Sequence, residues 1–169
     1  SPMYKENPLL VGKVVEEFVE LMKFVKKNKS KVVIASTSSI YSGLPLPFKE
    51  DMIPKVNDFY TEARLAIERL AQLYFKLHGI KSIALRLFSV YGPREEHKGK
   101  YANIVSQFCW SLLKNEKPVI YGDGSQTRDF VYVKDVVEAS LKCMEVDFGF
   151  EIVNVGFGKN WSFNQIVEM

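Results

Sequence analysis

The most informative segment of the chain is 32-VVIASTSS-39, in which four apolar residues are followed directly by four hydroxyl side chains. A short, uninterrupted and mostly β-branched run is typical of a strand that is buried on both faces of a parallel sheet. In sheets of that kind, ligands bind outside the carboxyl ends of the strands. The hydroxyl groups of residues 36–39 are therefore placed to meet a ligand, although Ser and Thr at such positions also commonly cap loop backbone groups.

Amphipathic helices are predicted on both sides of this strand. Residues 9–27 and 58–77 place apolar side chains at helical spacing, with charged residues between them. A second apolar strand is predicted at 82–88, and Gly79 fits the C-terminal cap of the helix before it. Alternating helices and strands are typical of right-handed crossovers in a parallel sheet, so we expect an α/β fold.

The sequence changes character after residue 94, where a charged loop begins. We therefore divide the chain into two regions, 1–94 and 95–169. In the second region the patterns predict helices at 102–114 and 133–144, strands at 119–121 and 151–155, and a helix start near Ser162.

Composition and charge exclude several classes of protein. With 47% apolar residues, the 169-residue chain can bury a core, and its net charge of +3 falls well short of the basic stripe of a nucleic-acid binder. No apolar stretch is long enough to span a membrane. The two cysteines form no CxxC pair and the two histidines lie apart, so we expect no metal site and a reducing, cytoplasmic environment.

Tyr60 and Arg64 are the pair of residues most informative about chemistry. Residues four apart on a helix share one face. A free phenol has a pKa near 10, so a tyrosine that acts as a base near neutral pH needs a neighbouring positive charge. Arg64 could supply that charge; the alternative is a surface tyrosine that only stacks on an arginine.

Several linked motifs occur in a fixed order: 32-VVIASTSSIY-41, Tyr60, 84-ALRLFSVYGPR-94 and 121-YGDGSQTRDFVYV-133. In this order they resemble the NAD-dependent epimerase/dehydratase group of extended short-chain dehydrogenase/reductases, and are most similar to nucleotide-sugar 4-epimerases. The resemblance implies a Rossmann-like parallel sheet at 1–94, a partial dinucleotide-binding domain whose N-terminal strands are absent. It also implies a small substrate-binding region at 95–169 that is truncated at its C-terminal end.

The resemblance further implies roles for individual residues. Tyr60 would take the proton of the sugar 4-hydroxyl while hydride passes to NAD, Thr37 would hold that hydroxyl and shuttle its proton, and Arg64 stands where the family has its catalytic lysine. The implied cofactor contacts are Tyr60, Arg64 and Phe88. The implied substrate contacts are Thr37, Ser89, Asn103, Tyr121 and Arg128, of which Arg128 would pair with the diphosphate.

The chain also departs from the family pattern. The family's glycine-rich turn, which receives the dinucleotide pyrophosphate, does not precede the helix predicted at 9–27. Arginine at position 64 is longer and planar, so it is not a conservative replacement for lysine. Ser89 replaces a common asparagine. Ser38 and Ser39 stand where sugar-nucleotide dehydratases carry Asp and Glu, which disfavours dehydration.

The expected function is therefore a nucleotide-sugar 4-epimerase, with a UDP-sugar as substrate and NAD as cofactor, of which the chain is the catalytic and substrate half. The alternative is a catalytically inactive protein of the same descent that binds nucleotide sugars or acts as a scaffold. In the family, the helices that correspond to 9–27 and 58–77 pair into a four-helix bundle, so a homodimer is expected. The other possibility is that these helix faces only cover the sheet.

Overall fold

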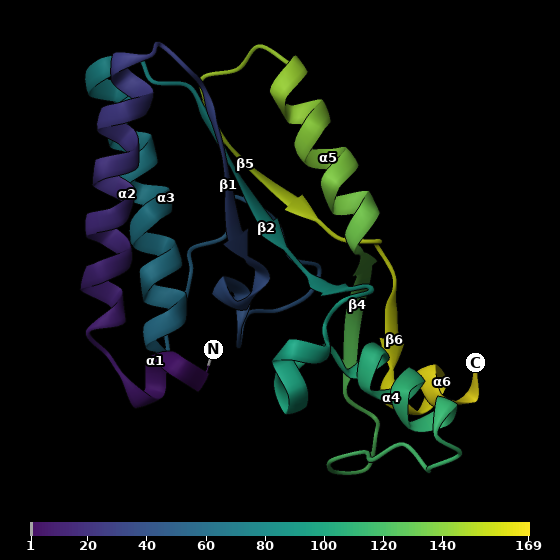
Figure 1. The fold of residues 1–169 in the computed structure, drawn as a ribbon. Coiled ribbons are helices and arrows are strands. Elements are labelled where there is room, and N and C mark those ends of the chain that lie inside the picture. Colours follow the sequence, from purple (N-terminus) through teal and green to yellow (C-terminus); the bar gives the residue numbers. More distant parts are fainter. Residues whose placement is uncertain (1) are drawn as a thin grey trace. The chain divides into compact units, whose positions relative to one another are not determined.

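The computed structural model describes residues 2–169 and divides them into two compact units, each with its own small sheet (Figure 1). The first unit contains the chain up to Leu87 together with residues 140–154, and the second contains residues 88–139 and 155–169. This division differs from the predicted regions 1–94 and 95–169. The reason is that residues 140–154 return to the first unit and complete its sheet.

The sheet of the first unit is parallel, as predicted. β1 (Val32–Thr37) pairs in parallel with β2 (Ser82–Leu87), residue for residue along both strands. β5 (Phe150–Val155) lies on the other side of β2, which gives the strand order β1-β2-β5. Because β1 and β2 run in the same direction, their carboxyl ends lie at one edge of the sheet, and Thr37 is the last residue of β1.

Two long helices pack against this sheet. α2 (Leu10–Lys27) and α3 (Phe59–His78) lie side by side in Figure 1, and apolar residues three or four positions apart point from both helices into the core. The bounds agree with the predicted helices to within one residue at each end. The core of this unit contains Phe18, Met22, Val25, Ile34, Ile67, Ala71, Ile80 and Ala84.

α3 begins at Phe59 because Asp58 caps it. The Asp58 carboxylate accepts hydrogen bonds from the Thr61 backbone N–H at 2.9 Å and from the Thr61 hydroxyl at 2.8 Å. Burial alone would raise the pKa of Asp58, but the hydrogen bonds from Thr61 outweigh it, so this pKa lies below its ordinary value. At the other end Gly79 has a φ of 67°, the left-handed conformation predicted for the cap.

A buried ion pair joins α3 to the sheet. Arg86 of β2 donates to Glu68 of α3 through Nη2 at 2.8 Å and Nε at 3.1 Å, and both side chains are 2% exposed. The hydroxyl of Ser36, at the end of β1, donates to the same carboxylate. Arg86 Nη1 also donates to the Tyr41 hydroxyl at 2.8 Å and to the Glu50 carbonyl at 3.2 Å. The pair therefore fixes α3, β1 and the loop after β1 to one another.

The second unit has a mixed sheet. β4 (Thr127–Tyr132) pairs in parallel with β3 (Ser89–Tyr91) and antiparallel with β6 (Asn160–Ser162). The ring of Phe163 contacts those of Phe108 and Phe130, with centroids 6.4 Å apart in each case. The helical segments of this unit are the 3₁₀ turn η2 (Glu96–Tyr101), α4 (Ile104–Leu113), the first part of α5 (Val133–Glu145) and α6 (Phe163–Glu168).

The strand predicted at 119–121 is wrong, since this segment forms no strand and its Val119 and Tyr121 side chains are exposed. β4 and β6 were not predicted. β4 mixes exposed polar residues at its start with buried apolar residues at its end, so it shows neither strict alternation nor an apolar run.

The first prediction concerns the buried ion pair. Arg86→Met leaves the Glu68 carboxylate buried without its partner, so we expect the free energy of unfolding to fall by about 3 to 5 kcal/mol. The double variant Glu68→Leu with Arg86→Met removes both charges and should recover part of this loss. Urea unfolding followed by circular dichroism measures both. A single variant that loses less than about 1 kcal/mol, as an exposed ion pair would, contradicts the role assigned to the pair.

The second prediction concerns the cap of α3. Asp58→Ala is expected to lower the free energy of unfolding by about 1 kcal/mol at neutral pH, whereas Asp58→Asn keeps a capping oxygen and should stay close to wild type. Because the folded pKa of Asp58 is lowered, its contribution is complete above the ordinary Asp pKa and is lost as the pH falls through the folded value. Urea titrations at neutral and acidic pH should therefore show that acid lowers the free energy of unfolding of Asp58→Asn less than that of wild type. If acid lowers the free energy of unfolding of Asp58→Asn and of wild type equally, ionised Asp58 does not contribute to stability.

Candidate active site

The eight residues singled out from the sequence are divided between the two units. Thr37, Tyr60 and Arg64 belong to the first unit, and Phe88, Ser89, Asn103, Tyr121 and Arg128 belong to the second. Each group is described within its own unit. Their catalytic, cofactor-binding and substrate-binding roles remain predictions.

The structure brings Tyr60 and Arg64 together. The Arg64 guanidinium lies 5.4 Å from the centre of the Tyr60 ring, and its Nη1 donates to the Ala35 carbonyl of β1 at 3.4 Å. The Tyr4 ring of the short helix α1 (Pro2–Glu6) meets the Tyr60 ring edge to face, with centroids 5.5 Å apart. The cation therefore contacts the aromatic ring of Tyr60 and at the same time ties the first turns of α3 to β1.

One donor of Arg64 is unused in this arrangement. Its Nε is buried and has no hydrogen-bond partner among residues 2–169. A buried N–H without a hydrogen bond costs free energy, and a bond to a ligand oxygen could remove that cost. Arg64 thus holds a free N–H beside the carboxyl end of β1.

Thr37 has a local structural role. Its side chain is buried, its Oγ1 accepts a hydrogen bond from the Ser39 N–H at 3.2 Å, and its hydroxyl donates to the Ser39 hydroxyl at 3.1 Å. This capping starts the 3₁₀ turn η1 (Ser38–Tyr41). The hydroxyl still has an acceptor lone pair for a ligand donor, because Thr oxygen carries two.

Ser89 and Asn103 meet in the second unit although they lie 14 positions apart. Asn103 Nδ2 donates to the Ser89 hydroxyl at 3.0 Å and to the Val90 carbonyl at 2.9 Å. Its Oδ1 accepts from the Val105 N–H at 3.0 Å and so caps α4. Asn103 therefore joins β3 to the first turn of α4.

The remaining three predicted residues, Phe88, Tyr121 and Arg128, lie in different segments of the second unit. The Phe88 backbone N–H donates to the Val155 carbonyl at 3.0 Å. Tyr121 is 78% exposed in the loop before β4. The exposed Arg128 lies on β4, where its Nη1 donates to the Thr127 carbonyl at 2.7 Å and its guanidinium carbon lies 6.0 Å from the centre of the Phe163 ring.

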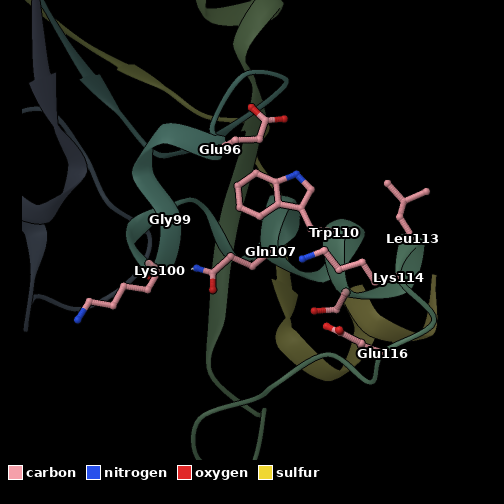
Figure 2. Close-up of a pocket in the computed structure, with 9 residues that line it drawn as sticks. Glu96, Gly99, Lys100, Gln107, Trp110, Leu113, Lys114 and Glu116 are labelled. Carbon is pink, nitrogen blue, oxygen red and sulfur yellow. Dashed lines mark hydrogen bonds between the residues drawn. The ribbon is translucent and has the colours of Figure 1, made fainter.

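A hollow of about 540 Å³ lies in the second unit, between η2 and α4 (Figure 2). None of the eight predicted residues lines it. Figure 2 shows the Trp110 indole between Glu96 of η2 and Gln107 of α4, with Lys114 nearby. Its residues are Glu96, Gly99, Lys100, Gln107, Trp110, Ser111, Leu113, Lys114 and Glu116.

Some residues that shape the two groups were not singled out from the sequence. Glu68, Arg86 and Glu95 are buried charges. Two of them stand where the sequence around them could have drawn attention: Arg86 inside an apolar strand, and Glu95 directly after Tyr-Gly-Pro-Arg. A charged residue in such a place requires a partner when it is buried.

Within residues 2–169, no three His, Cys, Asp or Glu side chains gather in a way that could hold a metal ion. No helix in the same part of the chain has the length and apolar character needed to cross a membrane.

Residues 7–156 match the family model described as NAD dependent epimerase/dehydratase. A putative UDP-glucose 4-epimerase of Methanocaldococcus jannaschii is 38% identical over 168 residues, which cover 97% of this chain and 54% of that protein. The chain thus spans about half the length of the curated relatives it matches.

Two solved structures are similar to the chain. The UDP-N-acetylglucosamine 4-epimerase of Methanobrevibacter ruminantium M1, in complex with UDP-N-acetylmuramic acid, has a TM-score of 0.93 at 31% identity and covers 99% of this chain and 55% of its own. The UDP-glucuronic acid 4-epimerase of Bacillus cereus, in complex with UDP-glucuronic acid and NAD, has a TM-score of 0.79 at 28% identity, with 92% and 49% coverage. The family predicted from the motifs is confirmed: the chain belongs to the NAD-dependent epimerase/dehydratase family.

Proposed function

We propose that the chain is the catalytic and substrate half of an enzyme that inverts C4 of a UDP-sugar with the help of NAD. The observation that carries the proposal is the contact of Arg64 with both the Tyr60 ring and the Ala35 carbonyl. It puts a tyrosine and a cation next to the strand whose carboxyl end bears Thr37. Family membership and the 4-epimerases among its relatives support the same reaction.

In this proposal the first unit handles the proton. Tyr60 removes the proton of the sugar 4-hydroxyl and later returns it to the 4-keto oxygen, while the Arg64 guanidinium lies against its ring. Thr37 holds the same oxygen and shuttles its proton, for which its own hydroxyl hydrogen turns from Ser39 to the sugar. The protein contributes orientation and electrostatics, which are large terms in reactions of this type.

The residues at this edge of the sheet fit NAD in part. The buried, unpaired Nε–H of Arg64 suits a ribose hydroxyl of the cofactor. The chain has no glycine-rich dinucleotide turn before α2, so we propose that residues outside 1–169 hold the pyrophosphate. When bound, NAD would supply the hydride acceptor and donor that inversion at the sugar carbon requires.

The second unit supplies the substrate contacts in this proposal. Arg128 pairs with the diphosphate, for which its planar donor fork is suited, and Asn103, Ser89 and Tyr121 contact the nucleotide. Phe88 lines the nicotinamide pocket. An exposed guanidinium on β4 is consistent with an anionic ligand. We also propose that the protein acts in the cytoplasm, which suits its two free cysteines.

Arginine at position 64 keeps the second candidate open, a protein that binds nucleotide sugars without turnover. The experiment that separates the two candidates uses the full-length protein with NAD and UDP-glucose, UDP-glucuronic acid or UDP-N-acetylglucosamine. Formation of the C4 epimer, detected by NMR, supports the enzyme. Calorimetric binding of a UDP-sugar without NAD binding or product supports the inactive protein.

The third prediction tests the base. Tyr60→Phe keeps the ring and its contact with Arg64 but removes the hydroxyl, so kcat for C4 inversion should fall by about 100-fold to 10,000-fold while UDP-sugar affinity stays similar. Tyr4→Phe alters the neighbouring ring in the same way and should leave kcat close to wild type. If Tyr60→Phe turns over at the wild-type rate, the proposed role of Tyr60 is wrong.

The fourth prediction concerns a second copy of the chain. We propose that α2 and α3 pair with the same helices of a partner, because both carry exposed large apolar residues, namely Leu21, Phe24, Leu73 and Leu77. Phe24→Glu with Leu77→Glu should convert a dimer into a monomer in light scattering coupled to gel filtration. Leu113→Glu, at an exposed position on α4, is the matched control and should stay dimeric. A monomeric wild-type protein would overturn this proposal.

A further inference from the structure

Glu95 is a buried carboxylate to which neither the motifs nor the proposed mechanism gives a role. The residue is 6% exposed. It accepts hydrogen bonds from the Lys98 ammonium at 2.7 Å, from the Asn103 backbone N–H at 3.4 Å and from the Ser106 hydroxyl. Burial alone would raise the pKa of Glu95, but these donors outweigh it and lower the pKa, so the group is charged at neutral pH.

The bonds of Glu95 fold the chain back onto α4. The segment 95–103 leaves β3, makes the 3₁₀ turn η2 and then starts α4. Glu95 fastens the beginning of the segment to Ser106, and Gln107 fastens its end by donating to the Ala102 carbonyl at 2.8 Å. Figure 2 shows the same side of α4, with Gly99 and Lys100 of the segment near Gln107. The segment is therefore held at both ends by one helix.

Asn103 is the residue that this arrangement fixes. Its backbone N–H is bound to Glu95, and its side chain bridges Ser89 and Val90 of β3 and the Val105 N–H of α4. Both Nδ2 hydrogens are used and one acceptor position of Oδ1 is filled, so the amide has one orientation. The second lone pair of Oδ1 remains for a ligand donor.

The surroundings of Glu95 suit a carboxylate. Three donors of different kinds converge on it, namely an ammonium, a backbone amide and a hydroxyl. A glutamine would present an NH₂ group to at least one of these donors and would leave the Lys98 ammonium without its counter-charge. The ionised side chain can therefore accept from all three donors at once.

We propose that Glu95 is a positioning residue of the nucleotide-sugar site: its buried charge sets the backbone of Asn103, and through it the Asn103–Ser89 pair, in the conformation that receives the nucleotide. The inference rests on the proposed function, since it takes Asn103 and Ser89 as substrate contacts. Glu95 acts on affinity through Asn103 and touches no reacting atom.

The test measures UDP affinity of the full-length protein by calorimetry, together with kcat and KM for the UDP-sugar that is turned over. Glu95→Gln should raise both the Kd for UDP and the KM about 10-fold or more, which is what loss of a charge-assisted hydrogen bond costs, and change kcat little. Ser106→Ala removes one of the three donors and should give a smaller change in the same direction. Val25→Ala, a core variant of the first unit, lowers the melting temperature and should leave both constants unchanged.

A double-variant cycle separates positioning from general destabilisation. If Glu95 acts through Asn103, then Glu95→Gln should have little further effect on UDP affinity in an Asn103→Ala background. Wild-type UDP affinity in Glu95→Gln, or full additivity with Asn103→Ala, overturns the inference while leaving the proposed function intact. Should Glu95→Gln fail to fold, wild-type affinity in Ser106→Ala overturns it instead. A wild-type protein that binds neither UDP nor a UDP-sugar defeats the proposed function first.

Discussion

Two opposite charges without access to water constrain the first unit. Arg86 and Glu68 would each be costly to bury alone, so each must meet the other and have its remaining hydrogen-bonding groups satisfied. Ser36, Tyr41 and the Glu50 carbonyl supply those groups, and they come from β1 and the loop that follows it. Burial raises the pKa of Tyr41, although its bond from Arg86 works against this, and its phenol donates to Asn154. The edge of the sheet that bears Thr37 is therefore held by polar bonds as well as by apolar packing.

The first unit could be predicted closely because its pattern is strong. The helices at 9–27 and 58–77 have long apolar faces, and both strands contain apolar runs. β2 is buried along nearly its whole length, as expected of a strand with both faces covered, whereas β1 leaves Ala35 exposed. In the second unit the helices could also be predicted, since α4 and α5 end within two residues of the predicted 102–114 and 133–144, but its strands could not. Its strands β3 and β6 have three residues each, and both pair with β4, which starts with exposed polar residues. Whether these segments form strands therefore depends on their neighbours in space. The run at 119–121 has suitable residues but no strand to pair with.

In the candidate site too, one contact follows from sequence spacing and another depends on the tertiary structure. The contact of Tyr60 with Arg64 follows from a spacing of four on a helix. The bond between Ser89 and Asn103 does not follow from spacing, since it depends on how η2 turns the chain back. Glu68, Arg86 and Glu95 illustrate a general limit: a sequence shows that a residue is charged, but only the packing shows that it is buried, and burial gives such a residue its structural importance.

The first unit is assembled from two stretches of chain with most of the second unit between them. Phe150 and Ile152 of β5 pack against its core, and the Ser82 N–H bonds to the Gly149 carbonyl. During synthesis on the ribosome, β1 and β2 must wait until residues 150–155 have emerged before β5 can cover the open side of β2. Until then an unpaired row of β2 backbone groups stays accessible to mispairing and to chaperone capture.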